Sequence, residues 1–198
     1  MWLATLLTGC GVRCHDDQRS HPRAGGQVCH AHRAVRWRSQ SSGKAMTSQF
    51  DIKPYLGAGD LRFGMSHAIV EELIGAASAK KKGFLGETTE YRRENGLLTT
   101  YGLNTNELVE VGFSRNILEL EYEGIKLFTD PPREVFRSLV NIDGNPYESV
   151  GFIVLLNLGM TLTGFHDDDI YQRAVTVFAR GRWDGELRDL KPFDFANF

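Results

Sequence analysis

The stretch that decides the fold is LRFGMSHAIVEELIG, residues 61–75. Its first five residues are typical of a short strand or an extended lead-in. Ser66 is of the type that caps helices, and the apolar residues after it recur at helical spacing: Ile69, Val70, Leu73 and Ile74. Gly75 can adopt the left-handed conformation that closes a helix. The stretch therefore predicts a capped amphipathic helix with a marked end.

Downstream of this helix the apolar pattern changes from helical spacing to a period of two. The run Lys80-Lys81-Lys82-Gly83 first predicts a solvated loop, with a phosphate-binding patch as the functional alternative. The segments that then fit period two best are 99–103, 108–113 and 117–122, with a hairpin turn at 114–116. These segments predict an antiparallel meander. In the last of them, apolar residues alternate with carboxylates that define an acidic face: Glu119, Glu121 and Glu123.

A second helix is predicted for 131–140. Asp130 is expected to cap it, and the two prolines that follow are tolerated in a first turn. The apolar run 152–158 has strand length and belongs in the middle of the sheet. Segments 161–165 and 174–179 predict a hairpin around the loop 166–169. The predicted fold class is α+β, an antiparallel sheet with two main helices packed on one face.

The two predicted helices are related by a shift of 66 positions. This shift converts the apolar positions of the first helix into those of the second, namely Val135, Phe136, Leu139 and Val140. It also converts Gly75 into Asn141, and asparagine is the next best residue for a left-handed cap. We therefore expect an internal duplication of a helix-then-sheet unit, with repeats at 61–128 and 129–183.

Residues 61–75 resemble a module of small bacterial proteins, in which FGM followed by Ser or Thr opens a helix that ends in an aliphatic pair and glycine. The chain is similar here to the helix-plus-sheet units of the BamE/SmpA lipoproteins and to the tandem units of β-lactamase inhibitor protein. Some bacterial immunity proteins share this plan. Beyond these residues the resemblance is one of topology, and residues 46–198 contain no cysteine, unlike that inhibitor. The resemblance implies a binding scaffold and carries over no functional residue.

The first 45 residues differ in composition from the rest of the chain. They hold seven Lys or Arg against two acids, whereas residues 46–198 hold 16 basic and 23 acidic side chains, a net charge of −7. One interpretation takes Leu7-Thr8-Gly9-Cys10 as a lipoprotein cleavage site that anchors the protein in the cell envelope through Cys10. A second takes thiols and imidazoles of this segment as zinc ligands: Cys10, Cys14, Cys29, His15, His30 and His32.

We favour a third interpretation of residues 1–45. The segment is polar and cannot bury enough apolar surface to offset its ordering entropy, so we expect it to be a disordered leader, or a translated upstream stretch with Met46 as the true start. Residues 46–198 then form a single α+β domain in the cytoplasm. No run of about 18 apolar residues occurs, so no membrane-spanning segment is expected.

Few residues of 46–198 are of the types that catalyse reactions. Their two histidines are His67, expected at the surface of the first helix, and His166, expected in a hairpin loop. A Ser149–His166 pair can be written down, but no nucleophile-elbow sequence supports it. No glycine-rich loop joins a strand to a helix, which is the context that a dinucleotide fingerprint requires. We therefore predict a protein that is not an enzyme and holds no cofactor.

Two short clusters are candidates for contact with a partner. The first is an acidic loop, which predicts a solvated hairpin tip or a surface for a basic partner, with divalent metal binding as the alternative: His166, Asp167, Asp168 and Asp169. The second combines two guanidinium groups with an indole, a composition enriched at protein interfaces: Arg180, Arg182 and Trp183. Its structural alternative is a strand end whose Trp packs inward while both Arg are solvated.

The leading hypothesis is a non-catalytic bacterial protein-binding module. It is expected to be an immunity or inhibitor protein that masks a basic partner, such as a toxin, with the acidic face at 119–123 and the loop 166–169. The charge of −7 disfavours nucleic acid as the partner. The alternative hypothesis is an envelope-associated lipoprotein with a structural or assembly role.

Overall fold

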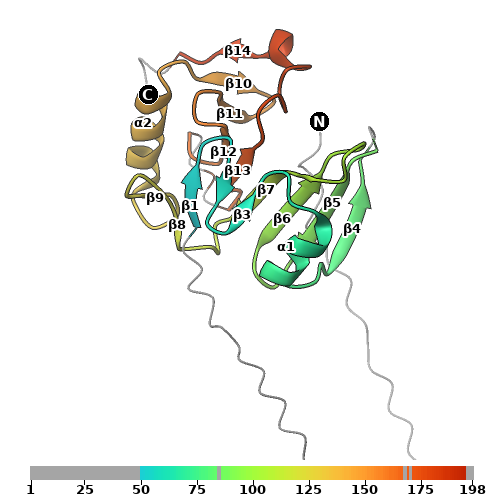
Figure 1. Ribbon diagram of the computed structural model, residues 1–198. Helices are drawn as coiled ribbons and strands as arrows, with labels where there is room; N and C mark the ends of the chain where they lie inside the picture. Colours follow the sequence, from blue (N-terminus) through green and yellow to red (C-terminus); the bar gives the residue numbers. More distant parts are fainter. Residues whose placement is uncertain (1–49, 84–85, 167–168, 170, 195–198) are drawn as a thin grey trace, which may run out of the picture. The chain divides into compact units, whose positions relative to one another are not determined.

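The computed structural model describes residues 50–83, 86–166, 169 and 171–194 (Figure 1). In this part of the chain the fold is mixed α+β, with two α-helices and two mostly antiparallel sheets, as the sequence predicted at this level. The predictions for residues 1–45, including those for Cys10, lie outside the described residues.

The larger sheet has nine strands in the order β14-β10-β11-β12-β13-β7-β6-β5-β4, and every neighbouring pair is antiparallel. Its strands are β4 (Ala79–Lys82), β5 (Thr88–Arg92), β6 (Leu97–Tyr101), β7 (Leu108–Ser114), β10 (Tyr147–Ser149), β11 (Phe152–Leu155), β12 (Met160–Thr163), β13 (Ala174–Phe178) and β14 (Lys191–Pro192). The predicted hairpin around the loop 166–169 is confirmed as β12 and β13, and β11 has strands on both of its sides.

The smaller sheet has the order β3-β2-β1-β8-β9, in which the pair β1–β8 is parallel. Its strands are β1 (Phe50–Lys53), β2 (Gly57–Ala58), β3 (Leu61–Arg62), β8 (Leu120–Tyr122) and β9 (Ile125–Lys126). The predicted hairpin at 114–116 is therefore wrong, because β8 does not pair with β7. The free edge of β7 is taken by β13 along five residue pairs, and β8 pairs with β1 instead.

Helix α1 (His67–Ile74) forms where the sequence predicts it, but two details of the prediction are wrong. Ser66 occupies the N-cap position without a capping hydrogen bond from its side chain. Ile69 is 47% exposed, because the helix buries a narrower face that centres on Val70 and Ile74. Gly75 ends the helix with a φ of 84°, and its N–H donates to the Glu71 carbonyl.

The lysine run is not the loop that its composition predicted. Lys80, Lys81 and Lys82 belong to β4, the outermost strand of the nine-stranded sheet, which among the described residues pairs with β5 alone. An edge strand has one row of backbone groups in water, and lysine is common there because its charge discourages pairing with other chains. Composition alone cannot distinguish such a strand from a solvated loop.

Helix α2 (Pro132–Asp143) starts near its predicted position and extends three residues further. The Asp130 carboxylate does not cap it; it accepts a hydrogen bond from the Lys126 backbone N–H at 2.8 Å. The predicted left-handed cap at Asn141 is also wrong, because Gly144 ends the helix with a φ of 74°. The additional turn brings Asp143 into the interior, where its carboxylate is buried.

One face of the nine-stranded sheet contributes to the main core. Strand register places a row of buried residues across five strands on this face: Ile153, Leu162, Val175, Phe113 and Leu97. Buried residues of α1, α2, β1 and β8 belong to the same core. In the tail, Phe193 packs against this core with its ring 5.7 Å from that of Phe136.

The Asp143 side chain ties the end of α2 to the turn between β11 and β12. One carboxylate oxygen, Oδ2, accepts hydrogen bonds from the backbone N–H groups of Asn157 at 2.8 Å and Leu158 at 3.2 Å. The Asn157 side chain donates in return to the Asp143 carbonyl at 2.8 Å. Burial raises the pKa of Asp143, although these backbone donors oppose the shift.

We expect Asp143→Ala to lower the free energy of unfolding by about 1–3 kcal/mol, because two inward-facing amides lose their acceptor. Urea denaturation followed by circular dichroism measures the change. The control is Asn141→Ala, which truncates an exposed side chain on the same helix and should leave stability within about 0.5 kcal/mol of the parent. Equal stability of the two variants would contradict the role of Asp143.

Candidate functional site

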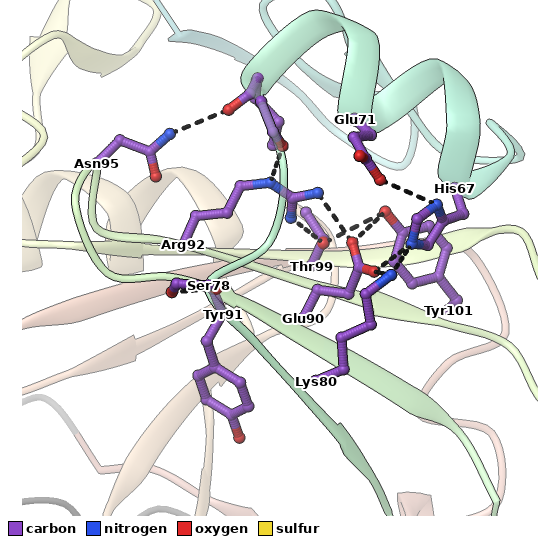
Figure 2. Close-up of polar contacts among 12 residues, drawn as sticks. His67, Glu71, Ser78, Lys80, Glu90, Tyr91, Arg92, Asn95, Thr99 and Tyr101 are labelled. Atoms are coloured by element: carbon purple, nitrogen blue, oxygen red, sulfur yellow. Dashed lines mark hydrogen bonds and ion pairs between the residues drawn. The ribbon is translucent and has the colours of Figure 1, made fainter.

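The densest group of ionisable side chains lies between α1 and strands β4, β5 and β6 (Figure 2). Its centre is Glu90 of β5, whose side chain is completely buried. Residues two apart in a strand point to the same face, so Arg92 lies beside it. On the next strand, Thr99 and Tyr101 lie on that face as well and contact the same two residues. We call this group the Glu90 network: His67, Lys80, Glu90, Arg92, Thr99 and Tyr101.

Each of the three side-chain nitrogens of Arg92 makes a hydrogen bond. Its Nη2 lies 2.8 Å from Glu90 Oε2, and its Nη1 donates to Thr99 Oγ1 at 2.9 Å. The third nitrogen, Nε, donates to the Gly75 carbonyl at 2.7 Å. Because Gly75 follows the last turn of α1, the guanidinium joins this end of the helix to the sheet.

The other oxygen of Glu90 meets the side chains of two further residues, a lysine and a histidine. Lys80 Nζ on the edge strand lies 2.8 Å from Oε1, and Nε2 of His67 contacts the same oxygen. His67 Nδ1 is 3.6 Å from the Glu71 carboxylate one turn along α1. The Tyr101 hydroxyl donates to Glu90 Oε2 at 3.3 Å. The first turn of α1 is therefore joined to the sheet through the same carboxylate.

The electrostatics of the network favour the ionised form of Glu90. Burial by itself raises the pKa of this carboxyl, but hydrogen bonds from Lys80 and Arg92 and the nearby His67 outweigh burial and hold the pKa below its ordinary value. A general base works best with a pKa near the working pH. A carboxylate stabilised in its charged form by Lys80 and Arg92 is better suited to holding elements together than to moving a proton.

Sequence reasoning missed the Glu90 network. It placed His67 at the surface and singled out neither Glu90 nor Arg92. One signal was present: opposite charges two residues apart in a segment of period two share a strand face, where they can form an ion pair. The partner strand has the alternation Leu97, Thr99, Tyr101 on the same face, which is buried. The same signal does not place Lys80 in the network, because the composition of the lysine run predicts a loop.

The predicted acidic face is only partly formed. Glu119 and Glu123 lie in turns on either side of β8 and are exposed, and Glu121 within β8 is half-buried. Of the apolar residues that alternate with them, Leu120 and Tyr122 are buried, but Leu118 is 54% exposed. The strand is shorter than predicted, and the alternation fails where the chain is in a turn.

The acidic loop does not bring its described members into a common site. His166 is half-buried, with its ring 6.2 Å from the rings of both Phe136 and Phe193. Asp169 accepts hydrogen bonds from the backbone N–H groups of Tyr171 at 3.1 Å and Gln172 at 3.3 Å. Asp167 and Asp168 lie outside the described residues. Within the described ranges, no group of three or more His, Cys, Asp and Glu is placed to hold a metal ion.

The second predicted cluster divides into three different environments. Arg182 forms ion pairs with Glu110 at 2.9 Å and with Glu87 at 3.2 Å. Burial raises the pKa of Glu110, and the charge of Arg182 opposes that shift. Trp183 is half-buried, with its ring 6.1 Å from those of Phe152 and Phe178. Arg180 alone of the three is exposed, and it stacks on the ring of Tyr55.

Comparison with known proteins adds no assignment to this geometry. No family model, curated protein or solved structure matches the chain. In the described ranges, no helix combines the length and apolar character needed to span a bilayer.

Proposed function

We propose that residues 46–198 form a non-catalytic protein-binding module whose partner lies against one face of the nine-stranded sheet. The observation that supports this is a row of residues across six strands that alternates with the core-facing row: Val154, Thr161, Thr176, Gly112, Leu98 and Tyr91. Thr176, Leu98 and Tyr91 in this row are half-exposed, whereas Val154, Thr161 and Gly112 are buried. The buried end of the row belongs to a second, smaller core on this side of the sheet, in which Tyr55 and Trp183 pack against Val154, Phe178 and Leu190. Small and aromatic side chains on a broad sheet suit contact with a protein surface. We call the half-exposed part of this side, formed by Thr176, Leu98 and Tyr91, the open face.

The open face follows from an arrangement of the helices that we also propose. Both helices contribute buried residues to the core on the opposite side of the sheet, which supports packing on one face. Each helix precedes four antiparallel strands, β4 to β7 after α1 and β10 to β13 after α2. The two sets of strands meet at the pair β7–β13, an order that supports a duplication with repeats at 61–128 and 129–183.

The charge of the domain supports a basic partner, as an immunity or inhibitor protein would have. Residues 46–198 have a net charge of −7, and Glu119 and Glu123 are exposed beside β8. Such charges accelerate association more than they tighten the final complex, and salt screens them. Capture of the partner should therefore decline as the ionic strength of the lysate is raised.

The test is capture of partners from the native host by the tagged protein, quantified by mass spectrometry. The variant Thr176→Arg places a long charged side chain on the open face, and the matched control Asn141→Arg places it on an exposed position of α2. We expect one protein to be lost at least about tenfold with Thr176→Arg and retained with Asn141→Arg, which corresponds to 1.4 kcal/mol of binding. Equal recovery with both folded variants would contradict the open face as the binding surface.

A further inference from the structure

Tyr55, in the turn between β1 and β2, has an unfavourable backbone conformation. Its φ is 63°, which is rare for a bulky side chain. Such a conformation persists only where the surroundings hold it, and it is most frequent at functional sites. Here the Tyr55 hydroxyl donates to the Leu156 carbonyl, and the ring lies 6.0 Å from that of Phe178. The Gly159 backbone also packs closely against Tyr55, so that a side chain at Gly159 would lie 3.2 Å from the ring.

The Tyr55 ring supports the guanidinium of Arg180. The central carbon of that group lies 4.2 Å from the ring centroid. Stacking uses the face of a guanidinium and leaves its N–H edge available. Arg180 is exposed, and no carboxylate of the described residues forms an ion pair with it. Arg92 and Arg182 differ in this respect, because each is paired with a carboxylate of the chain.

Apolar and aromatic side chains surround this stack. Leu56, next to Tyr55, is 61% exposed, and Trp183 is half-buried nearby against Phe178, the same ring that Tyr55 contacts. Tyrosine, tryptophan and arginine are the residue types that dominate binding energy at protein interfaces. Asp184 is the acidic residue closest to Arg180 in the sequence, and its charge acts on Tyr55. A test must therefore include a variant that removes this charge.

We propose that the Tyr55–Arg180 stack anchors a carboxylate side chain of the protein partner, with an adjacent apolar side chain of that partner against Leu56 and Trp183. Charge complementarity identifies the ligand, because the planar N–H edge of a guanidinium matches a carboxylate with two parallel hydrogen bonds. The anchor rests on the proposed protein-binding function and specifies one residue type that the partner presents. A lysine at position 180 keeps the charge but not the planar edge, so it cannot replace the arginine.

The test uses the full chain, labelled with 15N, and a blocked peptide, acetyl-Leu-Glu-Leu-amide, followed by NMR. The Trp183 indole signal is assigned with Trp183→Phe. We expect the glutamate peptide to shift the Trp183 and Arg180 side-chain signals with a dissociation constant of about 1–10 mM. The matched glutamine peptide should bind at least about tenfold more weakly. Arg180→Lys and Arg180→Gln should both reduce binding by a similar factor, and Asp184→Asn should leave it unchanged or strengthen it.

The anchor would be overturned by no shift at about 10 mM glutamate peptide, by equal shifts with the glutamine peptide, or by unchanged binding to folded Arg180→Gln. Inorganic phosphate that reproduces the whole effect would also overturn it, because the site would then be a general anion site. The capture experiment separates this failure from failure of the proposed function. If Arg180→Gln still captures the partner that Thr176→Arg loses, the open face stands and the anchor does not.

Discussion

Replacing Glu90 with leucine should lower the free energy of unfolding by about 3–5 kcal/mol, one of the two largest effects that we expect in this protein. The cost is large because the charged partner of Glu90, Arg92, remains in the interior. Arg92 is almost completely buried, and without Glu90 its charge keeps only the neutral acceptors Thr99 and Gly75. Lys80 and His67 also lose the carboxylate that holds the first turn of α1. Urea denaturation measured by both fluorescence and circular dichroism gives the change.

The control for this prediction is the double variant Glu90→Leu/Arg92→Leu. Removing both members of a buried ion pair leaves no uncompensated charge, so the double variant should be more stable than Glu90→Leu alone. A double-mutant cycle then gives the coupling energy of the pair. A cost below about 1 kcal/mol for Glu90→Leu would show that water reaches Arg92 and that the network is not a buried clamp.

The Glu90 network should also shape the acid sensitivity of the protein. The folded-state pKa of Glu90 lies below the ordinary value of 4.5, so its contribution to stability is present above pH 4.5 and is lost as the pH falls through the folded-state pKa. Asp143 and Glu110 have raised pKa values and act with the opposite sign. In Glu90→Gln, stability should therefore fall less steeply with acid than in the parent. Parallel stability curves from pH 7 downward would contradict this assignment.

The second large effect is expected for Phe136→Ala, at about 3–5 kcal/mol. Phe136 is completely buried on α2 and contacts the rings of Phe193 and His166. Its removal leaves a cavity among α2, the loop after β12 and the C-terminal segment, and these elements cannot all collapse into it. Differential scanning calorimetry measures the loss.

Two further substitutions serve as controls for Phe136→Ala. Phe136→Leu retains most of the side-chain volume and should cost less than Phe136→Ala. Ile142→Ala truncates an apolar side chain on the same helix that is 46% exposed, and it should cost less again. If Phe136→Ala and Ile142→Ala had similar effects, the packing of α2 against the C-terminal segment would have to be reconsidered.

The sequence alone determined the elements whose signals are local. The helix at 67–74 is encoded by the spacing of Val70 and Ile74 and by Gly75, and these interact within one or two turns. The hairpin of β12 and β13 is likewise encoded by two adjacent apolar segments and the polar loop between them. The local pattern also placed the end of α2 wrongly at Asn141. Gly144, three residues further on, is the better left-handed cap and ends the helix.

Only the tertiary structure decided which strands pair and which charges are buried. Strand β8 pairs with β1 because β13 occupies the edge of β7. Strands β7 and β13 are some 60 residues apart in the chain. The lysines of β4 became an edge strand because β5 was available to pair with them. Glu90 became the centre of a network because α1, β4 and β6 all meet at its carboxylate. Strand pairing and burial depend on contacts between distant segments, and a pattern read along the chain does not contain those distances.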